Sequence, residues 1–484
     1  MPSPMVVACG QGGISPAASF LSGALGSINK SLQKPPPGSS GSSRQPALPP
    51  PPRHPLLSLF PRGPLAEPAM VFLDSEHKLS GLLPACLSRS HTVMSHTGFG
   101  GNWSRGFHSC AAAPGGAPGA APAKSTGLPR SRSVPPPAPP SKPGWDTSLQ
   151  PTRRVVESSA GTLLDRAMAS VHDVARHRAA PPAFLVCHSL TGGTGAGFTS
   201  RLLSHMADEF PKAPIYTYSV TPFHSPSFLT VDSCGPLWSY NALLCLSYLE
   251  TFAAGSFLRS NQELLKECKA LGGRGGGGGD ATMGDVNRRI GEDLQSLLYP
   301  PSDLSLIAGT TVVPGHKYLS VVTSGPVSSR ADSVVGGMEA QAKFCSSNSP
   351  IKDIELRQNR TLRAHVICRG YAPDSVTDDA RQRCYKVLHR GLNFDHRGLG
   401  EGPPALDPDV FGVTAGTFGE RAVTAVSLRS GVASFARLVV SRAEGMRAAG
   451  AYLHYYEEVE EDDWREAIEI AWGIVERVEG MFGI

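Results

Sequence analysis

Short runs of apolar and β-branched residues, each ended by glycine or a polar residue, recur along the first half of the chain. Four of them have the length of a strand: residues 5–9 (MVVAC), 69–73 (AMVFL), 183–187 (AFLVC) and 214–220 (PIYTYSV). Such runs are typical of strands in the middle of a sheet, where both faces are covered. Residues 91–94 (HTVM) begin in the same way.

Amphipathic segments lie between these runs. The helices that they predict span residues 15–32, 160–177, 198–210 and 282–298. Residues 241–268 also have a helical pattern, interrupted near Gly255. The alternation of strand, loop and helix predicts a doubly wound α/β sheet with parallel strands, whose ligand site lies at the carboxyl ends of the strands.

The pattern changes after Tyr318. Strand candidates at residues 319–325, 361–370 and 422–431 are interspersed with helical segments, which predicts a second, smaller α/β unit. The last helix is clearly amphipathic, and its apolar stripe consists of Trp464, Ile468, Ala471, Val475, Val478 and Phe482. That stripe favours a helix docked on its own domain over a helix reserved for a partner.

These patterns predict three structural divisions. Residues 1–270 form the first domain, residues 271–430 a connecting helix with the intermediate α/β domain, and residues 431–484 a C-terminal helical segment. Much of the content of 53 glycines and 43 prolines lies in tracts that cannot build a core, and disordered insertions are predicted at about residues 34–68 and 111–153. A glycine-rich linker, GGRGGGGG, follows Leu271.

Charge and cysteine usage exclude several functions. Lysine and arginine total 45 against 41 acidic residues, and a net charge of +4 is too small and dispersed for a nucleic-acid binder. The ten cysteines lack metal-ligand spacing, which predicts reduced, buried thiols. No apolar run approaches the roughly 20 residues that span a bilayer, so we expect a cytosolic protein without a membrane partner.

The strongest candidate for chemistry is the loop TGGTGAG at residues 191–197, between a predicted strand and a predicted helix. Glycines let backbone N–H groups approach phosphate oxygens, and the N-terminus of the helix presents partial positive charge to them. The loop lacks the lysine of a P-loop and the spacing of a dinucleotide-binding turn. Taken alone, it is equally compatible with a tight turn.

The loop resembles the GGGTGSG signature of the tubulin superfamily, including the His-Ser pair before it, here His188 and Ser189. Other segments resemble that family in the same order: GQ at residues 10–11, LDSE at 73–76, TGFGGNW at 97–103 and AYLHYYEEVEEDDW at 451–464. The segments TLRAHVICRG and AYLHYYEEVEEDDW are most similar to the delta branch. The resemblance implies a parallel-sheet GTPase domain, an intermediate domain and C-terminal helices.

The resemblance also implies a ligand set of GTP or GDP with Mg²⁺. The residues that it assigns to the nucleotide are Gly10, Gln11, Gly100, Asn102, Ser189, Gly192, Gly193, Thr194, Gly195, Gly197, Asn261 and Asn287. It assigns the metal to Asp74 and Glu76, as hard oxygen ligands. The two asparagines, Asn261 and Asn287, would read the base, because a carboxamide offers both a donor and an acceptor to guanine.

Hydrolysis in this family depends on an acidic residue supplied by the neighbouring subunit. Asp303 is the candidate here, and a helix N-cap is an equally good interpretation of it. The resemblance therefore implies at most a slow, assembly-dependent GTPase. It also implies other tubulins or microtubule-organising proteins as partners, and a place in the cytoskeleton at centrioles and basal bodies, where delta tubulins support triplet microtubules and cilium assembly.

Several positions depart from the family pattern. Ile14 and Gly101 stand where asparagines are usual, and Met283 stands where an aromatic residue stacks on the base. These departures leave open a non-hydrolysing, nucleotide-free tubulin-like interaction protein. A bacterial-type cell-division GTPase is disfavoured, because those chains lack the AYLHYYEE segment. Nothing in the sequence forms the acid, base or nucleophile group of a metabolic enzyme.

Overall fold

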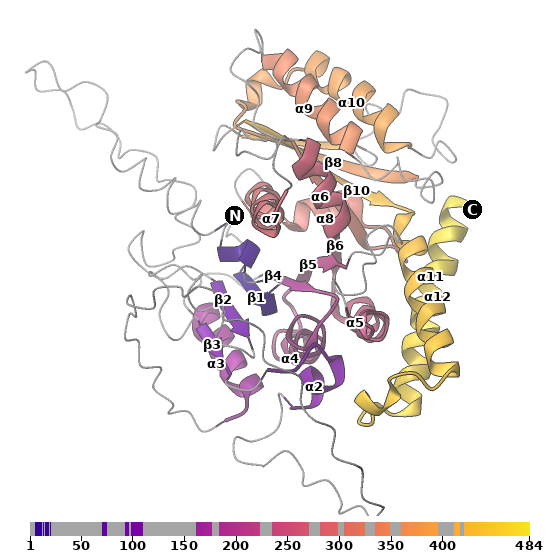
Figure 1. Cartoon of the computed structure of the whole chain (residues 1–484). Helices are drawn as coiled ribbons and strands as arrows, with labels where there is room; N and C mark the ends of the chain where they lie inside the picture. The colour runs from indigo at the N-terminus through magenta and orange to yellow at the C-terminus, as the bar shows by residue number, and fades with distance from the viewer. Residues whose placement is uncertain are drawn as a thin grey trace, which may run out of the picture.

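The computed structural model describes most of the segments that are predicted to form helices and strands (Figure 1). The described residues are 5–11, 13, 15–18, 20, 70–74, 92–95, 98–109, 161–176, 183–222, 235–270, 281–298, 304–324, 334–348, 360–394, 411–416 and 421–484. Both predicted insertions, the glycine-rich linker, Ile14, Glu76 and Asp303 lie outside them.

Ten strands of the described residues form one sheet, in the order β3-β2-β1-β4-β5-β6-β7-β10-β8-β9. Their bounds are β1 (Met5–Cys9), β2 (Met70–Asp74), β3 (Thr92–Met94), β4 (Phe184–Ser189), β5 (Ile215–Thr221), β6 (Gly255–Ser260), β7 (Tyr318–Thr323), β8 (Thr361–Arg369), β9 (Phe411–Gly416) and β10 (Ala422–Arg429). Neighbouring strands are parallel from β3 to β7, whereas β10 runs antiparallel to both β7 and β8. The doubly wound, mostly parallel α/β fold is thereby confirmed.

Helices cover both faces of the sheet because alternate strand residues are buried on opposite sides. On β1, Val7 and Cys9 join one core with α3 (Leu163–Arg176), α4 (Thr199–Glu209) and α5 (Trp238–Phe252). Val6 and Ala8 join the opposite core with the helices on the other face. Those helices are α6 (Asn261–Ala270), α7 (Met283–Leu298) and α8 (Leu304–Thr311).

The prediction of an interrupted helix over residues 241–268 was wrong in its middle. The chain forms α5, then the central strand β6, and then α6. The strand sequence GSFLRS contains two serines and Arg259, so it does not resemble an apolar run. Its polar side chains are satisfied inside the protein instead: Ser256 accepts a hydrogen bond from Thr217 on β5, and ion pairs surround Arg259.

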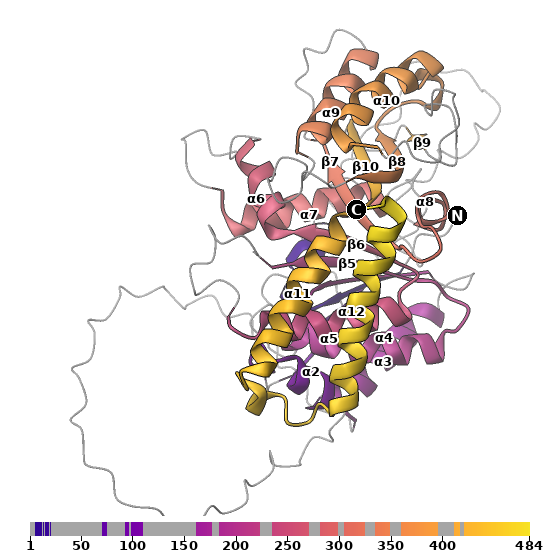
Figure 2. The ribbon, with the colours of Figure 1, turned by 90° about the vertical axis from the view of Figure 1, so that its right-hand side faces the viewer.

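The C-terminal part of the chain packs at one end of this sheet and against α5. Helices α9 (Val334–Asn348) and α10 (Asp378–Leu392) cover β8 and β10 with a third core, at one end of the molecule. Figure 2 shows α11 (Gly431–Ala448) and α12 (Glu461–Phe482) side by side across α5. Of the predicted α12 stripe, Ile468 is half-buried and the other five members are buried, so this helix docks on its own chain.

The seven described cysteines are buried and free, as predicted. Their thiols are poor acids, because burial raises the pKa of Cys9, Cys245 and Cys345 to about 12. Among the described residues, no helix is both long and apolar enough to cross a membrane.

Candidate functional site

The carboxyl ends of β1, β2, β3 and β4 meet at one edge of the sheet. The strand register pairs Cys9 with Leu73, Asp74 with Met94, and Ala8 with Cys187. The loops that follow these strands therefore start side by side. They contain most of the residues predicted to bind phosphate and metal.

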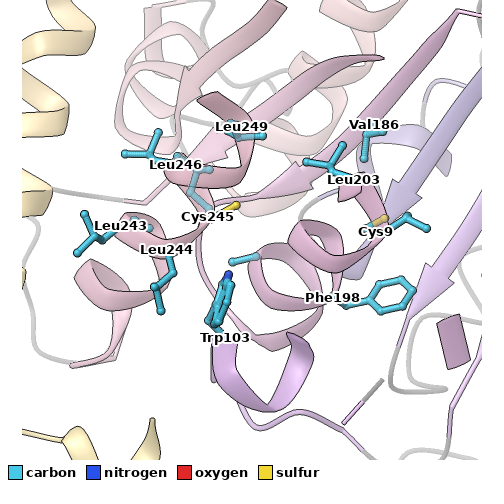
Figure 3. Close-up of a cluster of buried hydrophobic side chains, with 14 of the residues drawn as sticks. Cys9, Trp103, Val186, Phe198, Leu203, Leu243, Leu244, Cys245, Leu246 and Leu249 are labelled. Carbon is cyan, nitrogen blue, oxygen red and sulfur yellow. The ribbon is translucent and has the colours of Figure 1, made fainter. Parts of the chain in front are cut away.

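The glycine loop after β4 runs directly into the helix α4. Gly192 has a φ of 89°, a left-handed conformation that favours glycine, and the next residues form a π-helical turn, Gly193–Phe198, that continues into α4. The first N–H groups of a helix have no partner within it, and they are a natural binding site for an anion. Phe198 is fully buried and anchors the turn in the core (Figure 3).

Two loops, one at Gly10 and one at residues 98–104, approach the glycine loop so closely that side chains would not fit. A Cβ atom placed on Gly10 would lie 3.0 Å from the backbone nitrogen of Gly195, and Gly10 itself has a φ of 63°. A Cβ atom on Gly193 would lie 2.3 Å from the Cβ of Phe99, and one on Gly197 would lie 2.1 Å from the carbonyl oxygen of Trp103. The predicted glycines thus allow close packing of the chain around the glycine loop, whose residues Gly193–Phe198 are all buried.

Ser189 and His188 support the glycine loop from beneath. The hydroxyl of Ser189 donates to the carbonyl oxygen of Thr191 at 2.7 Å. Nδ1 of His188 lies 2.9 Å from the carbonyl oxygen of Gly195, and Nε2 lies 2.7 Å from the hydroxyl of Ser219. Because a carbonyl oxygen can only accept, Nδ1 carries the proton and Nε2 accepts from Ser219.

His188 is fully buried, and burial lowers the pKa of its imidazole to about 4, although its hydrogen bonds to backbone carbonyls favour the charged form. The ring is therefore neutral at neutral pH and holds the loop by a neutral hydrogen bond. From the sequence, His188 is only a mark of resemblance. Its structural role depends on Ser219 of the neighbouring strand, which the sequence does not place.

The second loop, residues 98–104, is held by a different set of bonds. The side chain of Asn102 donates to the carbonyl oxygen of Tyr455 at 2.7 Å and accepts from the N–H of Ser104 at 2.8 Å. Its carboxamide therefore links the loop to the C-terminal segment. Gly100 has a φ of 59° in this loop. The contacts predicted for both residues with nucleotide stay predictions.

Asn241 on α5 is a supporting residue that the sequence does not reveal. Its Oδ1 accepts from the N–H of Trp103 at 2.9 Å and from the hydroxyl of Tyr456 at 2.6 Å, and its Nδ2 donates to the carbonyl oxygen of Gly101 at 2.9 Å. Two of these bonds join Asn241 to the 98–104 loop, and the third joins it to the 451–458 segment. The resemblance of AYLHYYEE to the tubulin family thus has a structural reason, since this segment holds a loop of the candidate site.

Trp103 fixes the loop to the hydrophobic core. Its indole N–H donates to the hydroxyl of Ser200 at 3.0 Å, and its ring stacks on Phe107 at 4.5 Å between centroids. Figure 3 shows Trp103 beside α5. A cavity of about 200 Å³ lies behind it, between α2 (Trp103–Ser109), α5 and α12. Ligand pockets are commonly about 300–1,000 Å³, and this cavity lies on the helical side rather than at the strand ends.

Asp74 is the described acidic residue at this edge. It ends β2 and is 6% exposed. Its charge adds to the effect of burial in raising the pKa of the Cys9 thiol, so the two side chains are neighbours. The described residues contain no group of three or more metal-ligand side chains. Mg²⁺ at nucleotide sites needs only one or two carboxylates together with phosphates and water, so Asp74 fits that role.

The predicted base-reading residues lie farther along the sheet, beyond β6. Asn261 is the first residue of α6, Asn287 lies in the second turn of α7, and both are partly exposed. The two helices pack against each other. Met283, the first residue of α7, is 50% exposed. Gln11 is exposed just after Gly10.

Comparison with known proteins agrees with this geometry. Residues 157–269 match the family described as Tubulin/FtsZ family, GTPase domain, a span that includes β4, the glycine loop and α4. The α/β fold is consistent with a domain of that kind.

Similar curated proteins are tubulin chains, at low identity. The tubulin alpha chain of Encephalitozoon cuniculi (strain GB-M1) is 23% identical over 321 residues, which cover 63% of this chain and 70% of that protein. The tubulin beta-1 chain of Anemia phyllitidis is 24% identical over 321 residues, with 63% and 68% covered. The beta-2 chain of the same organism is 25% identical over 231 residues, with 45% and 53% covered.

Proposed function

We propose that the chain is a GTP-binding cytoskeletal subunit of the tubulin type. The observation that carries the proposal is the meeting of Gly10, residues 98–106 and residues 192–197 at the carboxyl edge of a parallel sheet. Backbone approach of this kind suits a phosphate chain, which needs N–H donors and little side-chain volume. The matched GTPase-domain residues and the tubulin relatives support the same conclusion.

In this proposal the phosphates of GTP or GDP lie on the loop of Ser189, Gly192, Gly193, Thr194, Gly195 and Gly197, next to Gly10 and Gln11. Asp74 and Glu76 would hold Mg²⁺, which would neutralise phosphate charge. The side chains of Asn261 and Asn287 would face the guanine edge with donors and acceptors. The chain divides functionally near residues 270 and 430, as the sequence predicts.

The proposed partners are other tubulins or microtubule-organising proteins, and the proposed location is the cytoskeleton at centrioles and basal bodies. The resemblance of residues 361–370 and 451–464 to delta tubulins supports this. Support of triplet microtubules and of cilium assembly follows from the same resemblance. Hydrolysis would be slow and would depend on assembly, with Asp303 acting on a neighbouring subunit.

The experiment that tests GTP binding combines nucleotide extraction with titration. The purified chain is denatured and its bound nucleotide is identified by chromatography, and then fluorescent GTP and ATP analogues are titrated with Mg²⁺. We expect guanine-selective binding that is weakened in Asn287→Ala and retained in Arg288→Ala, an exposed neighbour on the same helix. Absence of bound nucleotide and of saturable binding would refute the proposal.

A second candidate function is a tubulin-shaped interaction protein that is nucleotide-free or does not hydrolyse GTP. The half-exposed Met283 favours it, because a thioether offers no flat face for a base to stack on. This candidate predicts that the affinity for tubulin is the same with GTP, with GDP and without nucleotide. A pull-down with purified tubulin under those three conditions separates the two candidates.

A further inference from the structure

A group of four buried charges lies close in the sequence to Asn261 and Asn287, the two residues predicted to read the base. We name it the base-side ion cluster; it consists of Arg259, Glu267, Arg289 and Asp293. Arg259, Glu267 and Asp293 have fully buried side chains, and the side chain of Arg289 is 2% exposed. Buried charges are costly unless each is paired, so this arrangement requires a specific geometry.

The ion pairs cross between two segments of the chain. Arg259, at the end of β6, donates to Asp293 on α7 at 2.9 Å. Arg289, on α7, donates to Glu267 on α6 at 3.0 Å. Arg259 also donates to Glu267 at 2.8 Å. Each helix therefore carries a carboxylate that is bound by an arginine of the other segment.

Each asparagine lies within two residues of one arginine of this crossing. Asn261 follows Arg259 by two residues and precedes Glu267 by six. Asn287 precedes Arg289 by two residues and Asp293 by six. Asn261 thus lies between two members of the base-side ion cluster, and Asn287 lies less than one helical turn before Arg289.

The cluster is also fixed to the sheet. The hydroxyl of Tyr218 on β5 donates to Asp293 at 2.8 Å, and the hydroxyl of Thr323 on β7 donates to the other oxygen of the same carboxylate at 2.6 Å. Burial alone disfavours the charged form of Arg259, but the carboxylates of Asp293 and Glu267 outweigh it and hold the pKa of Arg259 well above its ordinary value. Arg259 therefore stays charged, and the bonds of Asp293 to Tyr218 and Thr323 anchor α7 directly to two strands.

Helix α6 contributes one residue to the cluster. Within the described residues, Glu267 is the cluster member on α6, and its Oε2 accepts from both arginines. Apolar packing also joins the two helices, because Leu264 and Cys268 of α6 share a buried core with Val286 and Ile290 of α7. Glu267 adds a charged bond from α6 to α7 to this packing, and a directional bond of this kind fixes how the helices lie against each other.

We propose that Glu267 is a positioning residue that sets the separation of Asn261 and Asn287, and with it the preference for guanine over adenine. This inference rests on the proposed function, in which the two asparagines contact the base. In the proposed function Glu267 does not contact the nucleotide. It acts by holding α6 in place against α7.

The test compares three variants of the full chain. Glu267→Gln keeps the shape of the side chain and removes its charge, and Glu267→Asp keeps the charge on a shorter stem. Thr323→Val is the matched control, because it removes a bond to Asp293 from the β7 side and leaves the bonds of Glu267 intact. Each variant is titrated with fluorescent GTP and ATP analogues, and amide hydrogen exchange is measured without ligand.

For Glu267→Gln we expect GTP affinity to fall roughly tenfold, the equivalent of one good hydrogen bond, while ATP affinity changes little. Exchange should become faster in α6 and stay unchanged in α4. Glu267→Asp should recover part of the selectivity, and Thr323→Val should retain the parental ratio of the GTP and ATP affinities. A fall of both affinities in equal proportion in Glu267→Gln would overturn the inference, because a merely structural role has that result.

The two proposals fail in different ways. If the parent chain binds guanine nucleotide and Glu267→Gln keeps its selectivity, the proposed function stands and the role of Glu267 is refuted. If the parent chain binds no guanine nucleotide, the proposed function falls, and the selectivity role falls with it. Exchange in α6 then decides separately whether Glu267 holds α6 to α7.

Discussion

The two sides of the candidate site are held by opposite physical means. The phosphate side is built from backbone against backbone, with glycines at the contacts and neutral hydrogen bonds from His188 and Asn241 beneath. The base side rests on the base-side ion cluster, in which Arg259 has no exposed side-chain surface. On the phosphate side, the space between backbones limits which substitutions are tolerated. On the base side, the need to pair every buried charge sets that limit.

This difference determines how each side responds to change. On the phosphate side, one added methyl group must displace a backbone carbonyl, so the response is steric. On the base side, loss of one charge leaves its partners buried without compensation, so the response is electrostatic. The four predictions below compare the two responses, from the largest expected effect to the smallest.

The largest effect is expected from breaking the ion cluster. Arg259→Met should lower the free energy of unfolding by about 3–5 kcal/mol, because it leaves two buried carboxylates with one arginine. Urea denaturation measures this. The control is Arg383→Met, which removes an ion pair whose two side chains are 53% and 61% exposed and should therefore change the free energy of unfolding far less. Equal losses in the two variants would contradict the view that burial makes this cluster critical.

The folded state should become less stable in acid because of His188, which holds the glycine loop on the phosphate side. The pKa of the buried imidazole is about 4, below the ordinary value of 6.5, so the unfolded chain binds a proton over this range before the folded chain does. Its contribution is fully present above pH 6.5 and is lost as the pH falls toward 4, by up to about 3 kcal/mol.

His188→Gln tests this contribution. The variant should lose stability less steeply than the parent chain between pH 6.5 and 4, as measured by urea denaturation at several pH values. His316 and His365 also have pKa values lowered to about 4 by burial, so a slope remains in the variant. An unchanged slope would show that His188 is already charged, or not buried, in solution.

The sequence predicts the phosphate side far better than the base side, because steric requirements leave a local pattern in the sequence and the pairing of distant charges does not. Glycines that permit close backbone approach must be glycines, so the pattern at residues 191–197 is visible in the sequence. Arg259 and Glu267 are ordinary charged residues whose burial depends on partners far away in the chain. For this reason strand β6 resembled an interruption in a helix, and the cluster was not foreseen.

Supporting residues show the same limit. The pairing of His188 with Ser219, and of Asn241 with Tyr456, depends on which strands and helices become neighbours. By contrast, strands β1, β2, β4 and β5 were predictable, because a continuous apolar run has few alternatives to a buried strand. Local patterns gave the elements, whereas the contacts that orient the loops depend on tertiary structure.

A methyl group added to the glycine loop should have a medium effect with a clear signature. Gly197→Ala places a Cβ atom 2.1 Å from the carbonyl oxygen of Trp103 and should cost about 1–3 kcal/mol. Gly445→Ala is the matched control, since it adds the same methyl group to a helix where no atom lies within 4 Å, and it should stabilise by roughly 0.5–1 kcal/mol. Similar results for both variants in urea denaturation would refute the steric description.

The smallest effect should come from the bond between the C-terminal segment and the phosphate-side loop. Tyr456→Phe removes the hydroxyl that lies 2.6 Å from Oδ1 of Asn241, and it should cost about 1 kcal/mol of stability. Because Asn241 also holds the backbone of Gly101 and Trp103, we expect weaker GTP binding as well. Tyr240→Phe removes a hydroxyl bonded to the carbonyl oxygen of Ala451 at 3.0 Å, away from that loop. It should lower the free energy of unfolding by a similar amount and leave GTP affinity unchanged.

Equal GTP affinity in the two variants would contradict this prediction. Neutral hydrogen bonds would then not position the 98–104 loop, and backbone packing alone would hold the phosphate side.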